Sequence, residues 1–297
     1  MNAPAILDPD QLGRKYPKLQ HPIDLSPLFL PGIALYDWQV DILRAACSPM
    51  SRALLSANNE AGKTGVVAVL YLLSAMAAFP GARCFAISKS ERQVQEQLFN
   101  DSILPVVEQW PKTWKVTKGE MIIRHVNGSS LRCYVCKDPK NVEGFHSALK
   151  VHKGKLRWLP CIYLMDECKG IDDEIYQAVE KINPWMLLAM SSPGTRDGWW
   201  SKGMDWDTLK KFEPRKTNVE YELGYPAAYE PPALNYTPNG TWTYRLKVSR
   251  DMCPHLMTAE YEVRRKAMEA FWGKNSPHIQ SMIYGDVQES EELLHAL

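Results

Sequence analysis

The chain alternates between short apolar runs and longer stretches whose apolar residues recur at helical spacing. The apolar runs predict β-strands at 52–57, 83–88, 121–126, 130–136, 161–165 and 186–190. The last two runs are apolar throughout, which is typical of central strands covered on both faces. The longer stretches predict helices at 37–46, 63–79, 91 to about 105, 172–182 and 259–272. Strands that alternate with helices indicate an α/β fold with a mainly parallel sheet flanked by helices.

Changes in composition divide the chain into four predicted parts. Residues 1–34 are rich in proline and lack periodicity, which predicts an extended arm on the surface. Residues 35–212 form the predicted α/β core. Residues 213–288 begin with a proline-rich crossover and form a predicted lid and linker subdomain, and 289–297 are a polar tail. Within the core, 137–158 is predicted to be an exposed basic loop, open to two interpretations: a contact with DNA phosphates or a solvated surface.

Composition excludes several classes of protein. Lys and Arg total 35 against 34 Asp and Glu, so the net charge of +1 excludes a uniformly basic nucleic-acid-binding surface. A hydrophobic content of 45% excludes global disorder. The longest apolar stretch, 66–79, is too short to span a bilayer, and no secretory signal is visible at the N-terminus. We therefore expect a cytoplasmic protein without a membrane partner, whose seven cysteines are reduced and mostly buried.

The strongest motif follows the first predicted core strand. The segment ANNEAGKT matches A-x4-G-K-T, a phosphate-binding loop in which alanine replaces the first glycine, and a long helix follows it. Backbone N–H groups of such a loop point at phosphate oxygens. Lys63 is expected to reach the β and γ phosphates of ATP, and the Thr64 hydroxyl is expected to hold Mg²⁺. The predicted nucleotide-binding residues of the loop are Ala57, Asn58, Asn59, Glu60, Ala61, Gly62, Lys63 and Thr64.

A pair of carboxylates follows the strand predicted at 161–165. Asp166 and Glu167 would lie at the carboxyl edge of the sheet, where ligands bind in open α/β folds. Asp166 is predicted to bind Mg²⁺, directly or through water. Glu167 is predicted to be catalytic by orienting the water that attacks the γ-phosphate, with Lys63 as the second catalytic residue. The alternative is a capping pair for the helix that follows.

Two weaker motifs complete the candidate site. The strand at 186–190 leads into SSPGT, and if this strand lies between the other two, Ser191, Ser192 and Thr195 are placed to sense the γ-phosphate. The alternative is that this segment is only a turn. Upstream of the phosphate loop, Gln39 is suited to bind the adenine edge through its amide, and Tyr36 to stack on the ring. Trp38 beside them is more typical of a core residue.

In combination these motifs resemble the large terminase subunit of tailed bacteriophages. The resemblance rests on the ordered segments YDWQ, ANNEAGKT, ISKSE, GFHS, CIYLMDE, SSPGT, CPH and GKNSPHIQSMIYGD, from about residue 30 to 290. It implies a P-loop NTPase fold of the RecA/ASCE-like type with a small lid, and an ATPase that uses ATP and Mg²⁺ to drive double-stranded DNA into a procapsid. It also implies a homo-oligomeric ring on the procapsid, with the portal protein and the small terminase subunit as partners, in the host cell cytoplasm.

The sequence departs from this family in three respects. Asn59 stands where many members carry an arginine inside the phosphate loop. The chain stops where a metal-dependent nuclease domain normally begins, so nuclease activity is not expected of it. The arginine that a neighbouring subunit would contribute to hydrolysis is not assigned by the sequence; its candidates are Arg92, Arg124, Arg132 and Arg196.

Two other functions compete with the packaging ATPase. A DEAD-type helicase or translocase shares the glutamine motif and the adjacent Asp-Glu, but no second RecA-like domain with an arginine-bearing final motif follows residue 200. A non-catalytic scaffold would bind nucleotide only to stabilise an assembly. Strand separation on a forked substrate would favour the first, and an absence of multiple-turnover phosphate release would favour the second.

Overall fold

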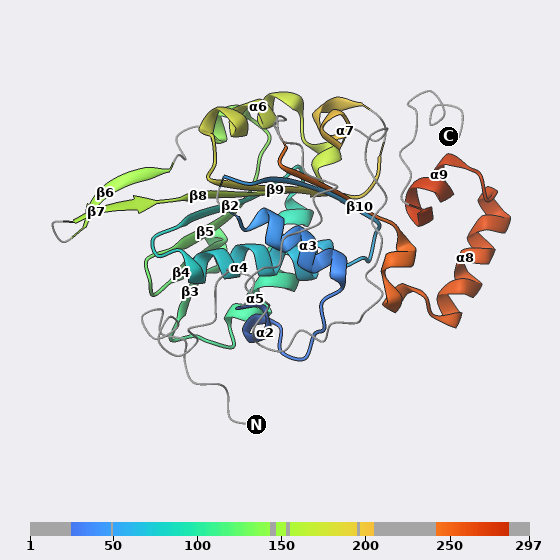
Figure 1. The fold of residues 1–297 in the computed structure, drawn as a ribbon, viewed down its shortest axis with the longest axis horizontal. Helices are drawn as coiled ribbons and strands as arrows, with labels where there is room; N and C mark the ends of the chain where they lie inside the picture. Colours follow the sequence, from blue (N-terminus) through green and yellow to red (C-terminus); the bar gives the residue numbers. More distant parts are fainter. Residues whose placement is uncertain are drawn as a thin grey trace.

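The computed structural model describes residues 25–48, 50–142, 147–152, 155–194, 197–204 and 242–284. An eight-stranded sheet forms its centre, with strand order β10-β1-β9-β8-β2-β5-β4-β3 (Figure 1). Neighbouring strands are parallel from β10 through β5, whereas β4 and β3 extend the sheet antiparallel. The strands are β1 (Arg52–Ala57), β2 (Arg83–Ser88), β3 (Trp114–Thr117), β4 (Ile122–His125), β5 (Ser130–Val135), β8 (Cys161–Asp166), β9 (Met186–Ser191) and β10 (Tyr244–Val248).

Helices cover both faces of this sheet (Figure 1). One face carries α3 (Asp37–Ala46), η2 (Lys63–Ala68), α4 (Val69–Ala78), η3 (Arg92–Ile103) and α5 (Leu104–Val107). The other carries α6 (Asp173–Ile182) and α7 (Gly198–Met204). Successive residues of β8 alternate between the two apolar clusters: Ile162 and Leu164 face the first, Tyr163 and Met165 the second. This double coverage explains why the central strands are apolar throughout.

Most of the predicted elements are confirmed. The predicted helices 37–46 and 259–272 correspond to α3 and α8 (Ala259–Trp272), and the predicted strands 52–57 and 83–88 correspond to β1 and β2. The Asn-Gly turn joins β4 to β5 as an antiparallel hairpin. Strand β9 lies between β1 and β8, as the motif argument required. The mainly parallel sheet flanked by helices is confirmed as the fold class.

Two expectations were wrong in part. The described end of the predicted arm contains α2 (Ser26–Phe29), and Phe29 is buried against Trp110 at a ring separation of 5.9 Å. The predicted basic loop contains an antiparallel hairpin, β6 (Ala148–His152) and β7 (Lys155–Leu159). The helix that begins after Glu91 changes from η3 to α5 at Leu104 and ends at Val107, which agrees with the stop or kink expected near Pro105.

The boundary predicted at residue 212 also needs correction. Strand β10 lies inside the region expected to be a lid, yet it pairs in parallel with β1 and forms one edge of the main sheet. Its buried positions alternate, as in an edge strand with one wet face. Residues 1–24 of the predicted arm, residues 205–241 and the predicted tail 289–297 lie outside the described residues.

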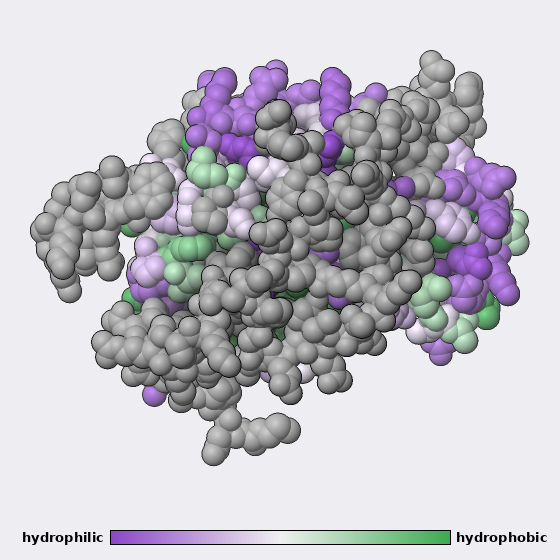
Figure 2. Space-filling view, viewed as in Figure 1, coloured by the Kyte–Doolittle hydropathy of each residue, from purple (hydrophilic) through white to green (hydrophobic). Residues whose placement is uncertain are grey.

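The last described segment follows β10. It comprises η8 (Arg250–Met252), η9 (Pro254–Leu256), α8, α9 (Pro277–Ile279) and η10 (Gln280–Tyr284). Helix α8 has no buried residue, and hydrophilic side chains gather over it and over α6 in Figure 2. Among the residues that the structure describes, no helix is long and apolar enough to cross a membrane.

Candidate active site

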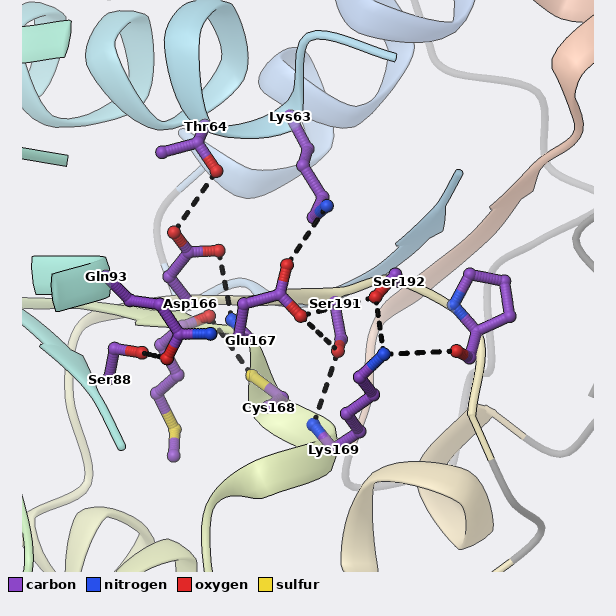
Figure 3. Close-up of polar contacts among 12 residues, drawn as sticks. Lys63, Thr64, Ser88, Gln93, Asp166, Glu167, Cys168, Lys169, Ser191 and Ser192 are labelled. Atoms are coloured by element: carbon purple, nitrogen blue, oxygen red, sulfur yellow. Dashed lines mark hydrogen bonds and ion pairs between the residues drawn. The ribbon is translucent and has the colours of Figure 1, made fainter. Parts of the chain in front are cut away.

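The three strands that carry the motifs end at the same edge of the sheet. Strands β1, β9 and β8 are adjacent and parallel, so their carboxyl ends bring the phosphate loop, the serine pair and the carboxylate pair together. Figure 3 shows Lys63 and Thr64 directed from the helix toward Asp166 and Glu167. The sequence-predicted core of the site is therefore assembled in space, from residues separated by about a hundred positions.

Positive φ angles shape the loop before Lys63. Gly62 has a φ of 91°, a conformation that glycine adopts without the steric cost of a Cβ atom. Glu60 also lies in the left-handed region, with a φ of 66°, although its Cβ atom makes this conformation sterically unfavourable. After this turn the chain enters η2, which begins at Lys63. Lys63 itself is 7% exposed.

Thr64 and Asp166 form the first polar contact between the two motifs. The Thr64 hydroxyl donates to Asp166 Oδ2 at 3.2 Å, and Asp166 Oδ1 accepts from the Glu167 N–H at 2.9 Å. Asp166 is 3% exposed. Burial and repulsion from Glu167 raise the pKa of Asp166 to about 6, against the attraction of Lys63. The nearby groups therefore do not fully offset the free-energy cost of burying the Asp166 charge, and a cation bound beside the carboxylate would lower that cost.

Glu167 lies between a lysine and two serines. Its Oε1 pairs with Lys63 Nζ at 3.0 Å, and its Oε2 accepts from the hydroxyls of Ser191 at 3.4 Å and Ser192 at 3.3 Å. Burial acts to raise the pKa of Glu167, but the attraction and hydrogen bond of Lys63, with smaller contributions from Lys169 and Ser192, hold it below its usual range. Glu167 therefore stays ionised at neutral pH.

Backbone strain accompanies this placement of Glu167. Its φ is 53° and its ψ is 51°, the left-handed region, directly after the last residue of β8. A non-glycine residue held there costs about 1–3 kcal/mol, and such residues cluster at functional sites. The turn points the Glu167 side chain toward Lys63 while Asp166 remains on the strand facing Thr64.

Tyr36 and Gln39 lie beside the phosphate loop. Gln39 is 3% exposed, and its Oε1 accepts a hydrogen bond from the Tyr36 N–H at 3.0 Å. Its Nε2 lies close to Gly62 of the loop: a Cβ atom added to Gly62 would be 3.1 Å from this nitrogen. Tyr36 stacks on His255 and bonds its Nδ1 through the phenol oxygen, at 2.9 Å. The structure thus brings both predicted base-binding residues to the loop, with the Tyr36 ring paired to a histidine. Trp38 is buried, as expected of a core residue.

The C-terminal segment supplies residues that the sequence motifs did not indicate. His255 Nε2 bonds the Glu60 carbonyl oxygen at 2.8 Å, and Asn58 Nδ2 donates to the Ile283 carbonyl. Ser281 donates to the Pro193 carbonyl at 3.3 Å. The sequence signal for this segment was its likeness to the end of the terminase ATPase half, which did not indicate which side chain touches the loop.

Lys169 is a further residue of the site that the sequence motifs did not indicate. Its Nζ lies 2.7 Å from Ser192 Oγ, and its backbone N–H donates to Ser191 Oγ at 3.3 Å (Figure 3). A lysine two positions after the carboxylate pair was a visible signal, but no spacing rule singled it out.

Other predicted residues are placed as follows. Ala57, Asn58 and Ala61 are buried in the loop, and Asn59 is exposed. Thr195 and Arg196 lie outside the described residues. In the part of the chain that the structure describes, no group of three or more His, Cys, Asp or Glu is arranged to hold a metal ion. A magnesium ion at Thr64 and Asp166 would therefore take its remaining ligands from water and phosphate, as this ion commonly does.

Solved structures with the same fold include large terminases of bacteriophages. The large terminase of a thermophilic bacteriophage in complex with ADP has a TM-score of 0.58 at 12% identity, over 86% of this chain and 54% of that chain. The same protein with ATP-gamma-S has a TM-score of 0.53 at 12% identity, over 86% and 53%. The large terminase ATPase domain of Thermus phage P74-26 has a TM-score of 0.54 at 16% identity, over 87% and 96%.

These likenesses settle the fold. The chain has the P-loop NTPase fold of the large terminase ATPase domains, and it spans about half the length of the large terminase solved with ADP. No family model and no curated protein matches the sequence.

Proposed function

We propose that this chain is the ATPase part of a viral DNA-packaging motor, which hydrolyses ATP to move double-stranded DNA into a procapsid. The observation that carries the proposal is the convergence of Lys63, Thr64, Asp166 and Glu167 at one edge of the sheet, in a fold shared with terminase ATPase domains. Two of those solved structures are named as complexes with ADP and ATP-gamma-S, which supports a nucleotide as the ligand of the corresponding loop here.

In the proposed complex the loop 57–64 holds the phosphates. Its backbone N–H groups and the helix that follows favour negative charge. Lys63 exchanges its partner Glu167 for the β and γ phosphates. Gln39 and Tyr36 flank the adenine, with Tyr36 held by His255.

Thr64 and Asp166 are the proposed magnesium ligands. Both offer hard oxygen donors, and they lie 3.2 Å apart. Burial raises the pKa of the Asp166 carboxyl, and its hydrogen-bond donors are neutral groups. A cation bound beside this carboxyl would favour its ionised form. When bound, the ion would neutralise charge on the phosphate oxygens.

Glu167 is the proposed catalytic base. Its carboxylate is ionised, and one oxygen is already anchored by Ser191 and Ser192. Once Lys63 engages phosphate, the other oxygen is available to accept a proton from water and to aim that water at the γ-phosphate. An arginine from a neighbouring subunit would neutralise transition-state charge. Of the candidates in the described part, Arg92 follows the carboxyl end of β2 and is exposed.

Ser191, Ser192 and Thr195 are the proposed sensors of the γ-phosphate. Ser192 bonds Glu167, and the next residue, Pro193, accepts from Ser281 of the C-terminal segment. Motion of this turn would therefore reach the segment 249–284, which serves as the lid in the proposal. The proposed partners are double-stranded DNA, the portal protein, the small terminase subunit and further copies of this chain in a ring, in the host cell cytoplasm.

The variant Glu167→Gln tests the proposal. It keeps the size and most hydrogen bonds of the side chain and removes the base, so we expect phosphate release to fall by about 10²–10⁴-fold while a fluorescent ATP analogue still binds. The exposed variant Glu174→Gln is the matched control and should retain activity. Near-normal hydrolysis by Glu167→Gln, or an absence of any hydrolysis by the unmodified chain with DNA and procapsids present, would contradict the proposal.

A further inference from the structure

The two carboxylate oxygens of Glu167 have different surroundings. Oε1 pairs with the ammonium of Lys63, which in the proposed function turns to the phosphates when ATP binds. Oε2 has fixed partners, the hydroxyls of Ser191 and Ser192 at the end of β9. When Lys63 leaves, the carboxylate keeps its orientation only through Oε2. What holds the two serines therefore decides where Glu167 points.

Lys169 holds both serines. Its Nζ donates to Ser192 Oγ at 2.7 Å and to the Pro193 carbonyl at 3.4 Å, and its backbone N–H donates to Ser191 Oγ at 3.3 Å. Each serine hydroxyl has one proton to donate. Because the ammonium and the amide of Lys169 can only donate, each serine oxygen accepts from Lys169 and directs its own proton to Glu167 Oε2. Lys169 thereby sets the direction of both hydrogen bonds.

Packing supports this role for Lys169. A Cβ on Gly194 would lie 3.2 Å from Cδ and 3.5 Å from Cβ of Lys169, so the turn after Ser192 lies directly against the lysine stem. The Pro193 carbonyl that accepts from Lys169 also accepts from Ser281. The lysine is thus fixed between the carboxylate and the turn, although part of its side chain remains exposed.

We propose that Lys169 is the positioning residue for Glu167: through Ser191 and Ser192 it anchors Oε2, so that Oε1 is the oxygen that accepts the proton of the attacking water. This inference rests on the proposed ATPase activity. It assigns one cation to each half of the cycle, with Lys63 paired to Glu167 before ATP binds and Lys169 holding the carboxylate afterwards. The charged groups that face Glu167 in the described residues are Lys63, Asp166 and Lys169.

The test compares Lys169→Met with Lys169→Arg. Methionine keeps the stem and removes the donors, so we expect kcat for ATP hydrolysis to fall about ten- to a hundredfold, with KM changed less than about threefold. The acid limb of the pH–rate profile should move to higher pH, because the carboxylate loses a cation that favours its ionised form. Arginine keeps charge and donors and should restore most of the rate. Lys89→Met, at an exposed lysine that pairs with Asp172, is the matched control.

A second measurement does not depend on turnover. In carboxyl-labelled protein without nucleotide, the NMR titration of Glu167 should show a higher pKa in Lys169→Met than in the unmodified chain. An unchanged titration, or full kcat with an unshifted pH profile, would overturn the role of Lys169. A chain that hydrolyses no ATP but shows the shifted titration would instead overturn the proposed ATPase function and leave Lys169 as a partner of Glu167.

Discussion

Tyr36 and His255, 219 positions apart, stack with their rings 5.5 Å apart and almost parallel, at 5°. The phenol oxygen bonds Nδ1 of the histidine, and the opposite ring nitrogen bonds the Glu60 carbonyl. Because a carbonyl can only accept, Nε2 carries the proton, and in the neutral ring Nδ1 accepts from Tyr36. One histidine therefore joins the start of α3, the phosphate loop and the C-terminal segment.

This contact predicts that His255→Ala weakens ATP binding. Two hydrogen bonds that fix the loop would be lost, each worth about 0.5–1.5 kcal/mol, so we expect KM for ATP to rise roughly five- to 150-fold with a smaller change in kcat. Tyr36→Phe keeps the stacked ring and loses one bond, and its effect should be smaller. Met257→Ala, at an exposed residue of the same segment, is the control. Equal KM values for all four proteins would show that the bridge does not support the loop.

A second prediction concerns the pH dependence of stability at Asp166. The folded-state pKa of about 6 lies above the ordinary value of 3.8, so the folded protein binds this proton more tightly than the unfolded chain does. Burying the charge therefore destabilises the fold progressively from about pH 4 to 6, and fully above that range. Asp166→Asn should raise the free energy of unfolding by about 1–3 kcal/mol at pH 8 and change it little at pH 4.

Urea unfolding of this variant at the two pH values provides the measurement, with the exposed Asp101→Asn as the control. The lowered pKa of Glu167 affects stability in the opposite direction, because the ionised Glu167 stabilises the folded state at pH values above its unfolded pKa. Glu167 is present in both proteins, so this contribution does not distinguish them. A variant no more stable than the parent at pH 8 would contradict the prediction.

Gly203 predicts a stability defect of steric origin. A Cβ at this position of α7 would lie 2.8 Å from Trp242 Nε1 and 2.9 Å from Leu54 Cδ1, and Leu54 is fully buried. Gly203→Ala should therefore cost about 1–3 kcal/mol. Gly119→Ala, where no atom lies within 4 Å, is the matched control and should be near neutral. Thermal unfolding measures both, and a Gly203→Ala protein with an unchanged Tm would mean that α7 can shift away from β1.

The cysteines predict slow thiol chemistry. All seven are free and buried, and burial raises the pKa of Cys136 to about 11 and that of Cys161 to about 12, so little reactive thiolate forms. Ellman's reagent should titrate less than about one thiol per native chain within minutes and all seven in guanidinium chloride. Lys89→Cys, which creates an exposed thiol, is the positive control. Rapid reaction of several native thiols would show that the sheet opens readily.

Local pattern was sufficient for most of the sheet and for the centre of the site. The apolar run at 161–165 and the carboxylates after it belong to one short segment. Because the carboxyl ends of parallel strands lie at one edge of the sheet, the sequence alone predicts that Lys63 and Glu167 lie close together. Strand β10 escaped prediction because its five residues follow a proline-rich stretch and find their partner far away, in β1.

The missed contacts share this non-local origin. A lone histidine such as His255 has no periodicity to mark it, and its partners Tyr36 and Glu60 lie about two hundred positions away. The hairpin at 148–159 had a visible signal, since Leu149 pairs with Trp158 and Val151 with Leu156, but the intervening lysines and arginine made the segment resemble a solvated loop.

The pairing of β10 with β1 has a consequence for folding during translation. As the polypeptide leaves the ribosome, β1 emerges early and its outer flank has no neighbour until residues 244–248 follow, a wait on the order of ten seconds or more at ordinary translation rates. During that interval the nascent phosphate loop also lacks the carbonyl of Ile283 and the ring of His255. Truncated or stalled chains should consequently expose the unpaired edge of β1, and we expect them to bind chaperones rather than nucleotide.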